Sequence, residues 1–233
     1  MPAPGQFILN KQVIPSELRS REWEAARVDY WRMERAFVMA GKVRFEDAQA
    51  CRNAAAALAN GKVSLIEARR AVREELERAG YRPTPGTTGT IKDIYTPRRL
   101  DVTLKTNVNM ARGYAEKNRL TGNAMYPASE LHRNRQSREP RDWQMRWNEA
   151  AASVNYEGVA RDGSFIALND SPIWAALSRW RTPYPPFDYG SGMWWRPVKW
   201  RVAEQKGLVT DEDMERIESQ RPESFNHDVA LDA

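Results

Sequence analysis

The stretch Arg98-Arg-Leu-Asp-Val-Thr-Leu-Lys-Thr-Asn-Val-Asn-Met-Ala-Arg-Gly-Tyr-Ala-Glu-Lys-Asn-Arg-Leu-Thr121 has a helical pattern over its whole length. Apolar residues such as Leu104 and Val108 recur on one face, and polar residues such as Lys105 and Arg112 occupy the other. Gly122 follows as a helix-ending residue. We therefore predict one long helix over residues 98–121, with its apolar face in the core.

The chain before this helix divides at a segment rich in proline, glycine and threonine. Residues 81–97 have that composition and are predicted to be a linker or a surface loop, at the boundary between two domains. Residues 16–80 are predicted to form a helical bundle with helices over 16–40, 45–59 and 64–79. The last two follow similar Gly-Lys-Val segments, as a duplicated hairpin would. Residues 1–15 hold three prolines and are predicted to be an extended arm.

The chain after the long helix mixes short helices with strand-like segments. A helix is expected over 142–153, short β segments within 154–168, a helix from Ser171, a proline-rich loop over 182–192 and a strand over 193–202. Residues 98–202 form the predicted second domain, and 203–233 an acidic tail with a capped helix over 210–219 and a disordered end. The predicted fold class is mainly α with a small β component, an α+β arrangement.

Composition narrows the class of protein. The 233 residues are 41% hydrophobic and contain one cysteine, so no intrachain disulfide can form and nothing indicates an oxidising compartment. No apolar run reaches the length of a membrane span, which predicts a soluble cytoplasmic product without a membrane partner. Nine acidic and three basic residues from Ala203 onward give a charge of −6, which leaves +11 for the preceding residues. This division suggests contact with a polyanion or an acidic protein face, although ordinary solubilising charge has the same appearance.

The usual signatures of catalysis and metal binding are absent from the sequence. Two histidines and one cysteine are too few for a typical zinc site, so we predict no metal and no cofactor. Gly190-Ser191-Gly192 is interpreted as a turn, because it lacks the strand and helix that flank a nucleophilic serine. Cys51 lies in an alanine-rich segment and is expected to pack inside a helix bundle. No phosphate-binding or dinucleotide-binding loop is recognisable.

The segment from His132 to Trp147 combines five arginines with two tryptophans. Arginine side chains bind phosphates and carboxylates, so we predict that nucleic acid or a protein partner contacts Arg133, Arg135, Arg138, Arg141, Arg146 and also Arg181. In an alternative interpretation the tryptophans are core residues and the arginines pair with Glu139, Asp142 and Glu149. The predicted core comprises Leu104, Val108, Trp143, Trp147, Trp174 and Trp200.

The order of these segments resembles the phage Mu F-like head morphogenesis family, the phage minor head proteins. Four segments carry the resemblance: Arg99 to Ala115, the arginine-rich Arg135 to Trp147, Asn169-Asp-Ser-Pro-Ile-Trp174, and Tyr184-Pro-Pro-Phe-Asp-Tyr-Gly-Ser-Gly-Met193. They cover residues 98–202. The chain departs from the family where Ser191 and Met193 stand in place of paired cysteines, so no metal or thiol role carries over.

The resemblance implies a structural protein of the virion, made in the cytoplasm of a bacterial host. Its expected partners are the portal protein, the major capsid protein and double-stranded DNA, and it would act in head morphogenesis without being an enzyme. The alternative is an enzyme that modifies nucleic acid or protein, such as a nuclease or toxin, with Arg138, Asp142 and Asp170 in a common cleft.

Overall fold

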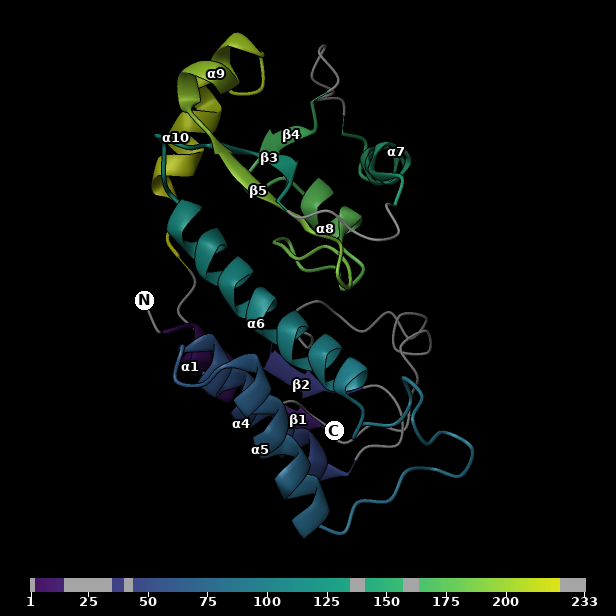
Figure 1. The fold of residues 1–233 in the computed structure, drawn as a ribbon. Coiled ribbons are helices and arrows are strands. Elements are labelled where there is room, and N and C mark those ends of the chain that lie inside the picture. Colours follow the sequence, from purple (N-terminus) through teal and green to yellow (C-terminus); the bar gives the residue numbers. More distant parts are fainter. Residues whose placement is uncertain (1–2, 15–34, 40–43, 135–140, 157–163, 223–233) are drawn as a thin grey trace. The chain divides into compact units, whose positions relative to one another are not determined.

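The computed structural model describes residues 3–14, 35–39, 44–134, 141–156 and 164–222 (Figure 1). The fold is mainly α-helical with a small β component, as predicted. The described helices are α1 (Pro4–Leu9), α4 (Phe45–Ala59), α5 (Leu65–Arg78), α6 (Pro97–Leu120), α7 (Trp143–Ser153), α8 (Ile173–Leu177), α9 (Trp200–Gln205) and α10 (Asp211–Ser219). The described strands are β1 (Gln12–Ile14), β2 (Ala36–Val38), β3 (Ala128–Arg133), β4 (Ile166–Leu168) and β5 (Met193–Val198).

The chain forms two compact units, and the boundary between them lies inside α6, between Arg112 and Gly113. The first unit holds the described residues before this point, and the second holds those after it. The prediction of a boundary at residues 81–97 is therefore wrong. That segment folds onto the first unit because it has a buried anchor of its own.

The anchor of this segment is Asp93, whose side chain is 4% exposed. Its carboxylate accepts hydrogen bonds from the Tyr81 hydroxyl and from the backbone N–H groups of Gly89 and Tyr95. Arg73 on α5 donates to the Tyr95 carbonyl at 2.9 Å. A segment whose polar groups are satisfied in this way is an ordered loop and not a spacer.

The first unit is built on α4 and α5, which lie side by side (Figure 1). The alanines of α4 are small enough to let the two helices approach closely, and α5 contributes Val72 and Leu76 to the shared core. Ser64 and Glu67 form a reciprocal capping box at the start of α5. Both predicted helices, 45–59 and 64–79, are confirmed.

The N-terminal region differs from its prediction. Residues 1–15 were expected to be an extended arm, but Pro4–Leu9 is a helix that buries Phe7 and Ile8, and β1 follows it. The helix expected over 16–40 lies mostly outside the described residues. Its described end, Ala36–Val38, is a strand that pairs in parallel with β1. Burial of these apolar side chains against α4 outweighs the extended tendency of the prolines.

The second unit is organised around a three-stranded antiparallel sheet in the order β4-β3-β5. Leu131 of β3 stands opposite Trp195 of β5, and Ala128 stands opposite Val198. Because side chains alternate along a strand, these two pairs face opposite sides of the sheet. Pro197 is accommodated because β5 is an edge strand of this sheet.

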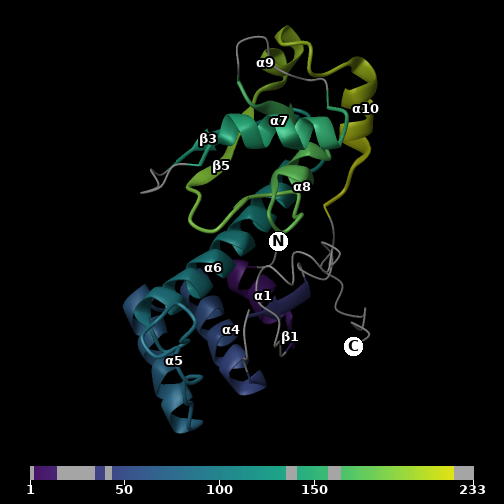
Figure 2. The same cartoon turned by 90° about the vertical axis from the view of Figure 1, so that its right-hand side faces the viewer.

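Helices cover both faces of this sheet. On one face α9 and α10 contribute to a small core around Ala128, Ile166 and Val198. On the other face α7 and α8 pack against each other (Figure 2), and Trp174 of α8 contacts Trp195 of β5. Residues 203–219 are thus an integral part of the unit and not a separate tail. The capped helix predicted within them is confirmed as α10, with Thr210 and Asp213 forming the capping box.

Two further predictions in the second unit are wrong. Residues 123–137 were expected to be irregular, but 128–133 is the central strand β3. Trp200 was expected in the core but is 37% exposed. The predicted strand over 193–202 ends at Val198, and Trp200 begins α9, so the alternation that would have placed its indole ring inward does not continue.

Candidate functional site

The aromatic core of the second unit has Trp174 at its centre. This side chain is fully buried, and its ring centroid lies within 5.3–5.7 Å of those of Trp147, Phe187 and Trp195. The Trp174 Nε1–H donates to the Leu168 carbonyl at 2.8 Å. Helices α7 and α8, the loop before β5 and β5 itself therefore meet at one residue.

The same loop also contacts α6 within the second unit. The rings of Tyr114 and Tyr184 meet edge to face at 5.8 Å between centroids. One residue earlier, Gly113 lies so close to the loop that an added Cβ would stand 1.7 Å from the Pro185 carbonyl oxygen. The close approach thus requires glycine at position 113.

Asp188 is the polar centre of the loop. Its side chain is 4% exposed, and three guanidinium groups approach it. Arg141 Nε lies 3.1 Å and Arg146 Nη1 lies 2.9 Å from Asp188 Oδ2, while Arg179 Nη1 lies 3.5 Å from Oδ1. The Tyr189 N–H also donates to Oδ1 at 2.7 Å. We call Arg141, Arg146 and Arg179 the arginine cluster.

Aromatic rings and backbone groups hold the arginine cluster in place. The Arg146 guanidinium lies over the Trp143 ring at 4.6 Å, and that of Arg179 lies over the Tyr189 ring at 5.5 Å. The Arg141 Nη2 donates to the Tyr189 carbonyl at 2.9 Å. Stacking and hydrogen bonding restrict the rotamers of these long side chains before any ligand arrives.

Among the described residues, the guanidinium groups of Arg141 and Arg146 share the one carboxylate of Asp188. Two unit charges about 6 Å apart repel by roughly 3 kcal/mol at an effective dielectric constant of about 20, and solvent screening reduces this repulsion for partly exposed side chains. One nearby guanidinium is enough to neutralise a carboxylate. Placing both Arg141 and Arg146 on Asp188 therefore favours a site at which a further anion would be stabilised.

The predicted contact arginines have several different environments. Arg141 and Arg146 form ion pairs with Asp188 inside the protein, and their side chains are also partly exposed to solvent. Arg133 is the last residue of β3, and Arg181 is exposed with a left-handed backbone at φ 57°. Arg135 and Arg138 lie outside the described residues.

The alternative interpretation of the same segment is confirmed in placing its tryptophans in the core. Among the described residues, it is wrong in expecting Asp142 to pair with an arginine. Trp143 and Trp147 are buried, but Asp142 accepts from the Met145 N–H as the N-cap of α7, and the arginines pair with Asp188 instead. Glu139 lies outside the described residues. The sequence analysis did not identify Asp188. The only signal for it in the sequence is its position between two aromatic residues in a proline-rich loop.

No family model, curated protein or solved structure matches this chain. The function must therefore be argued from its own residues and from the resemblance.

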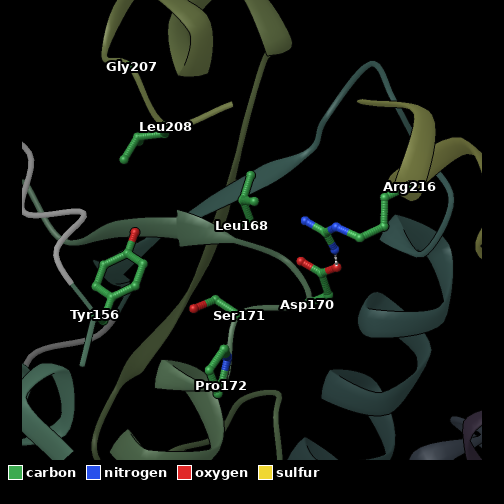
Figure 3. A pocket seen from close by; sticks show the side chains of 8 residues that line it. All are labelled: Tyr156, Leu168, Asp170, Ser171, Pro172, Gly207, Leu208 and Arg216. Atoms are coloured by element: carbon green, nitrogen blue, oxygen red, sulfur yellow. Dashed lines mark hydrogen bonds and ion pairs between the residues drawn. The ribbon is translucent and has the colours of Figure 1, made fainter. Parts of the chain in front are cut away.

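The second unit also contains a shallow pocket of about 380 Å³, away from the arginine cluster (Figure 3). Its walls are Tyr156, Leu168, Asp170, Ser171, Pro172, Gly207, Leu208 and Arg216. Asp170 binds Arg216 and accepts a hydrogen bond from Gln220, and the Tyr156 hydroxyl donates to the Ile166 carbonyl. Burial raises the pKa of Tyr156 to about 12, so the phenol stays protonated at neutral pH. These polar groups hold α10 and the surrounding loops in place.

The residues considered for an enzyme have structural roles where they are described. Asp142 caps α7 and Asp170 binds Arg216, while Arg138 lies outside the described residues. Ser191 is 2% exposed, and its Oγ accepts from the Met193 N–H within the loop. Within the described ranges, no three histidine, cysteine or acidic side chains gather as metal ligands would. No described helix is long and apolar enough to cross a membrane.

Cys51 is buried within α4, and burial raises the pKa of its thiol to about 12. Since the thiolate is the reactive form, we expect Cys51 to resist alkylation by iodoacetamide at neutral to mildly alkaline pH in the folded protein. The same thiol should react completely after denaturation in urea. Intact-protein mass spectrometry would measure both states, and rapid native labelling would contradict the burial of this residue.

Proposed function

We propose that this protein is a minor head protein of a phage or prophage that acts in head morphogenesis. The observation that carries the proposal is the packing, within the second unit, of described residues from the four resembling segments, the first of which enters this unit at Gly113. Tyr114 packs on Tyr184 of the loop before β5, and Trp147 packs on Trp174, which stacks on Phe187 of the same loop. Segments that depend on one another for burial form a module, and their shared order with the family is then harder to attribute to separate chance matches.

The proposed role is architectural. The described polar residues of the module stabilise its loops and helix ends, and its arginine cluster is suited to binding and not to bond cleavage. We place the protein in the virion, after synthesis in the host cytoplasm, in contact with the portal protein or the major capsid protein. The +11 charge of residues 1–202 also makes packaged double-stranded DNA a proposed contact.

The proposal predicts physical association with head components of the same phage. Tagged full-length protein, co-expressed with the portal and major capsid proteins, should retain at least one of them on an affinity column. It should also be detected by mass spectrometry in purified heads. The tail tube protein of the same phage serves as a control that should not be retained.

Absence from purified heads, together with no retention of portal or capsid protein, would contradict the proposed function. Turnover of DNA, RNA or a nucleotide cofactor by the purified protein would instead favour the enzymatic alternative.

A further inference from the structure

The arginine cluster differs in exposure from the carboxylate that it surrounds. The side chains of Arg141 and Arg146 are 34% and 25% exposed, whereas Asp188 is 4% exposed. A molecule that approaches from solvent therefore meets guanidinium groups and not the carboxylate. Within the described part of the chain, Arg141 and Arg146 carry two positive charges against the single negative charge of Asp188, so this conclusion does not depend on Arg179.

The cluster is also preorganised. Arg146 rests on Trp143, and Arg141 is tied to the backbone of Tyr189. Since part of the rotamer entropy of these side chains is already lost in the free protein, an anion bound here would pay a smaller ordering cost. A planar guanidinium offers two parallel N–H groups, which match the two oxygens of a carboxylate.

The arrangement of charges favours a single compact anion over a polyanionic backbone. Duplex DNA presents phosphates in a row, and binding it takes cations spread along a track. Here the guanidinium groups converge on one point, and three other arginines of the same unit bind carboxylates of their own: Arg119 binds Glu116, Arg196 binds Glu130 and Arg216 binds Asp170.

We propose that the arginine cluster binds a carboxylate of a partner protein, presented by an acidic surface segment of that protein. The inference rests on the proposed function where it takes this partner to be a head protein. Trp143 and the Tyr189 carbonyl hold Arg146 and Arg141 in position, Asp188 competes for their N–H groups, and the incoming carboxylate binds the N–H groups that remain exposed.

The first test measures binding of the full-length protein to a fluorescein-labelled hexaglutamate peptide by fluorescence anisotropy at low salt. Arg146→Gln should weaken binding about tenfold, because it removes a charge-assisted fork from the site. Arg146→Lys should recover part of the loss, because it restores the charge without the fork. Arg201→Gln is the matched control, since Arg201 is exposed on α9 of the same unit, and should change the affinity less than about twofold. A hexaglutamine peptide should not bind.

The second test uses Asp188→Asn, which removes the internal competitor and keeps the side-chain shape. If the cluster is a binding site, the peptide should bind about threefold more tightly or better, because each guanidinium then meets less competing negative charge. A purely structural role for the cluster predicts unchanged or weaker binding. Near-UV circular dichroism verifies that each variant keeps the packing of its aromatic core.

Several results would overturn the proposal. Peptide binding that Arg146→Gln and Arg201→Gln weaken equally would show a diffuse charge effect. A short DNA duplex that binds more tightly than the peptide and loses more affinity in Arg146→Gln would assign the cluster to nucleic acid. Weaker peptide binding by folded Asp188→Asn would show that the cluster only stabilises the loop.

The outcome for this site is separable from that of the proposed function. If wild-type protein associates with portal or capsid protein and Arg146→Gln associates equally well, the carboxylate site is rejected and the assembly role stands. If the peptide results hold and no head protein associates, the site stands and the assembly role is rejected.

Discussion

Replacing Trp174 with alanine is expected to lower the free energy of unfolding of the second unit by about 3–5 kcal/mol. The side chain is fully buried among three other aromatic rings, and its Nε1–H is bonded to the Leu168 carbonyl. The substitution leaves a large cavity and also removes the donor for that carbonyl. Urea unfolding followed by near-UV circular dichroism would measure the effect, because that signal reports aromatic packing.

The matched control is Trp200→Ala, the same chemical change in the same unit. Trp200 is 37% exposed and lies at the start of α9, so its removal should cost less than about 1 kcal/mol. The sequence alone predicts both tryptophans to be core residues. Equal destabilisation by the two substitutions would contradict the arrangement of this unit.

Replacing Gly113 with alanine is expected to destabilise the protein by about 1–3 kcal/mol or more, because the added methyl group overpacks the site. Helix propensity alone would predict that this substitution stabilises the protein, since alanine is favoured over glycine inside a helix by about 1 kcal/mol. The Cβ would stand 1.7 Å from the Pro185 carbonyl oxygen and 2.7 Å from its carbon, and both atoms belong to the backbone. Relief would require the loop that carries Asp188 to move away from α6.

The control for this prediction is Arg112→Ala, one residue earlier in α6 and exposed. It should change the stability by less than about 0.5 kcal/mol, as surface substitutions usually do. Gly113→Ala should also reduce peptide binding by the arginine cluster, because that cluster depends on the position of the loop. A more stable Gly113→Ala variant would show that the loop and α6 are not in close contact.

Sequence pattern was most reliable where the interactions are local. The long helix α6 and the helices α4, α5 and α7 all follow from periodicity and terminal residues within one segment. Burial of Trp143 and Trp147 also follows, since residues four apart lie on one face of a helix.

Features that depend on distant partners were missed. The strand β3 reads Ala-Ser-Glu-Leu-His-Arg and has no clean alternation, because it lies between two strands and has a helical layer on each face. Its buried Ser129 is satisfied by Asn169, which is 40 residues away. No local rule predicts that partner. The same holds for the domain boundary, which falls within the uninterrupted pattern of α6.

The candidate site shows the same division. The sequence by itself determined that arginines and tryptophans are concentrated around residues 133–147, and it determined the helix that displays Arg146. Only the tertiary structure decided that Arg141, Arg146 and Arg179 meet at Asp188, which lies 47 residues after the first of them and nine after the last. The physical reason is that burial of Asp188 required cationic partners, and the packing of Trp174 brought those partners to one place.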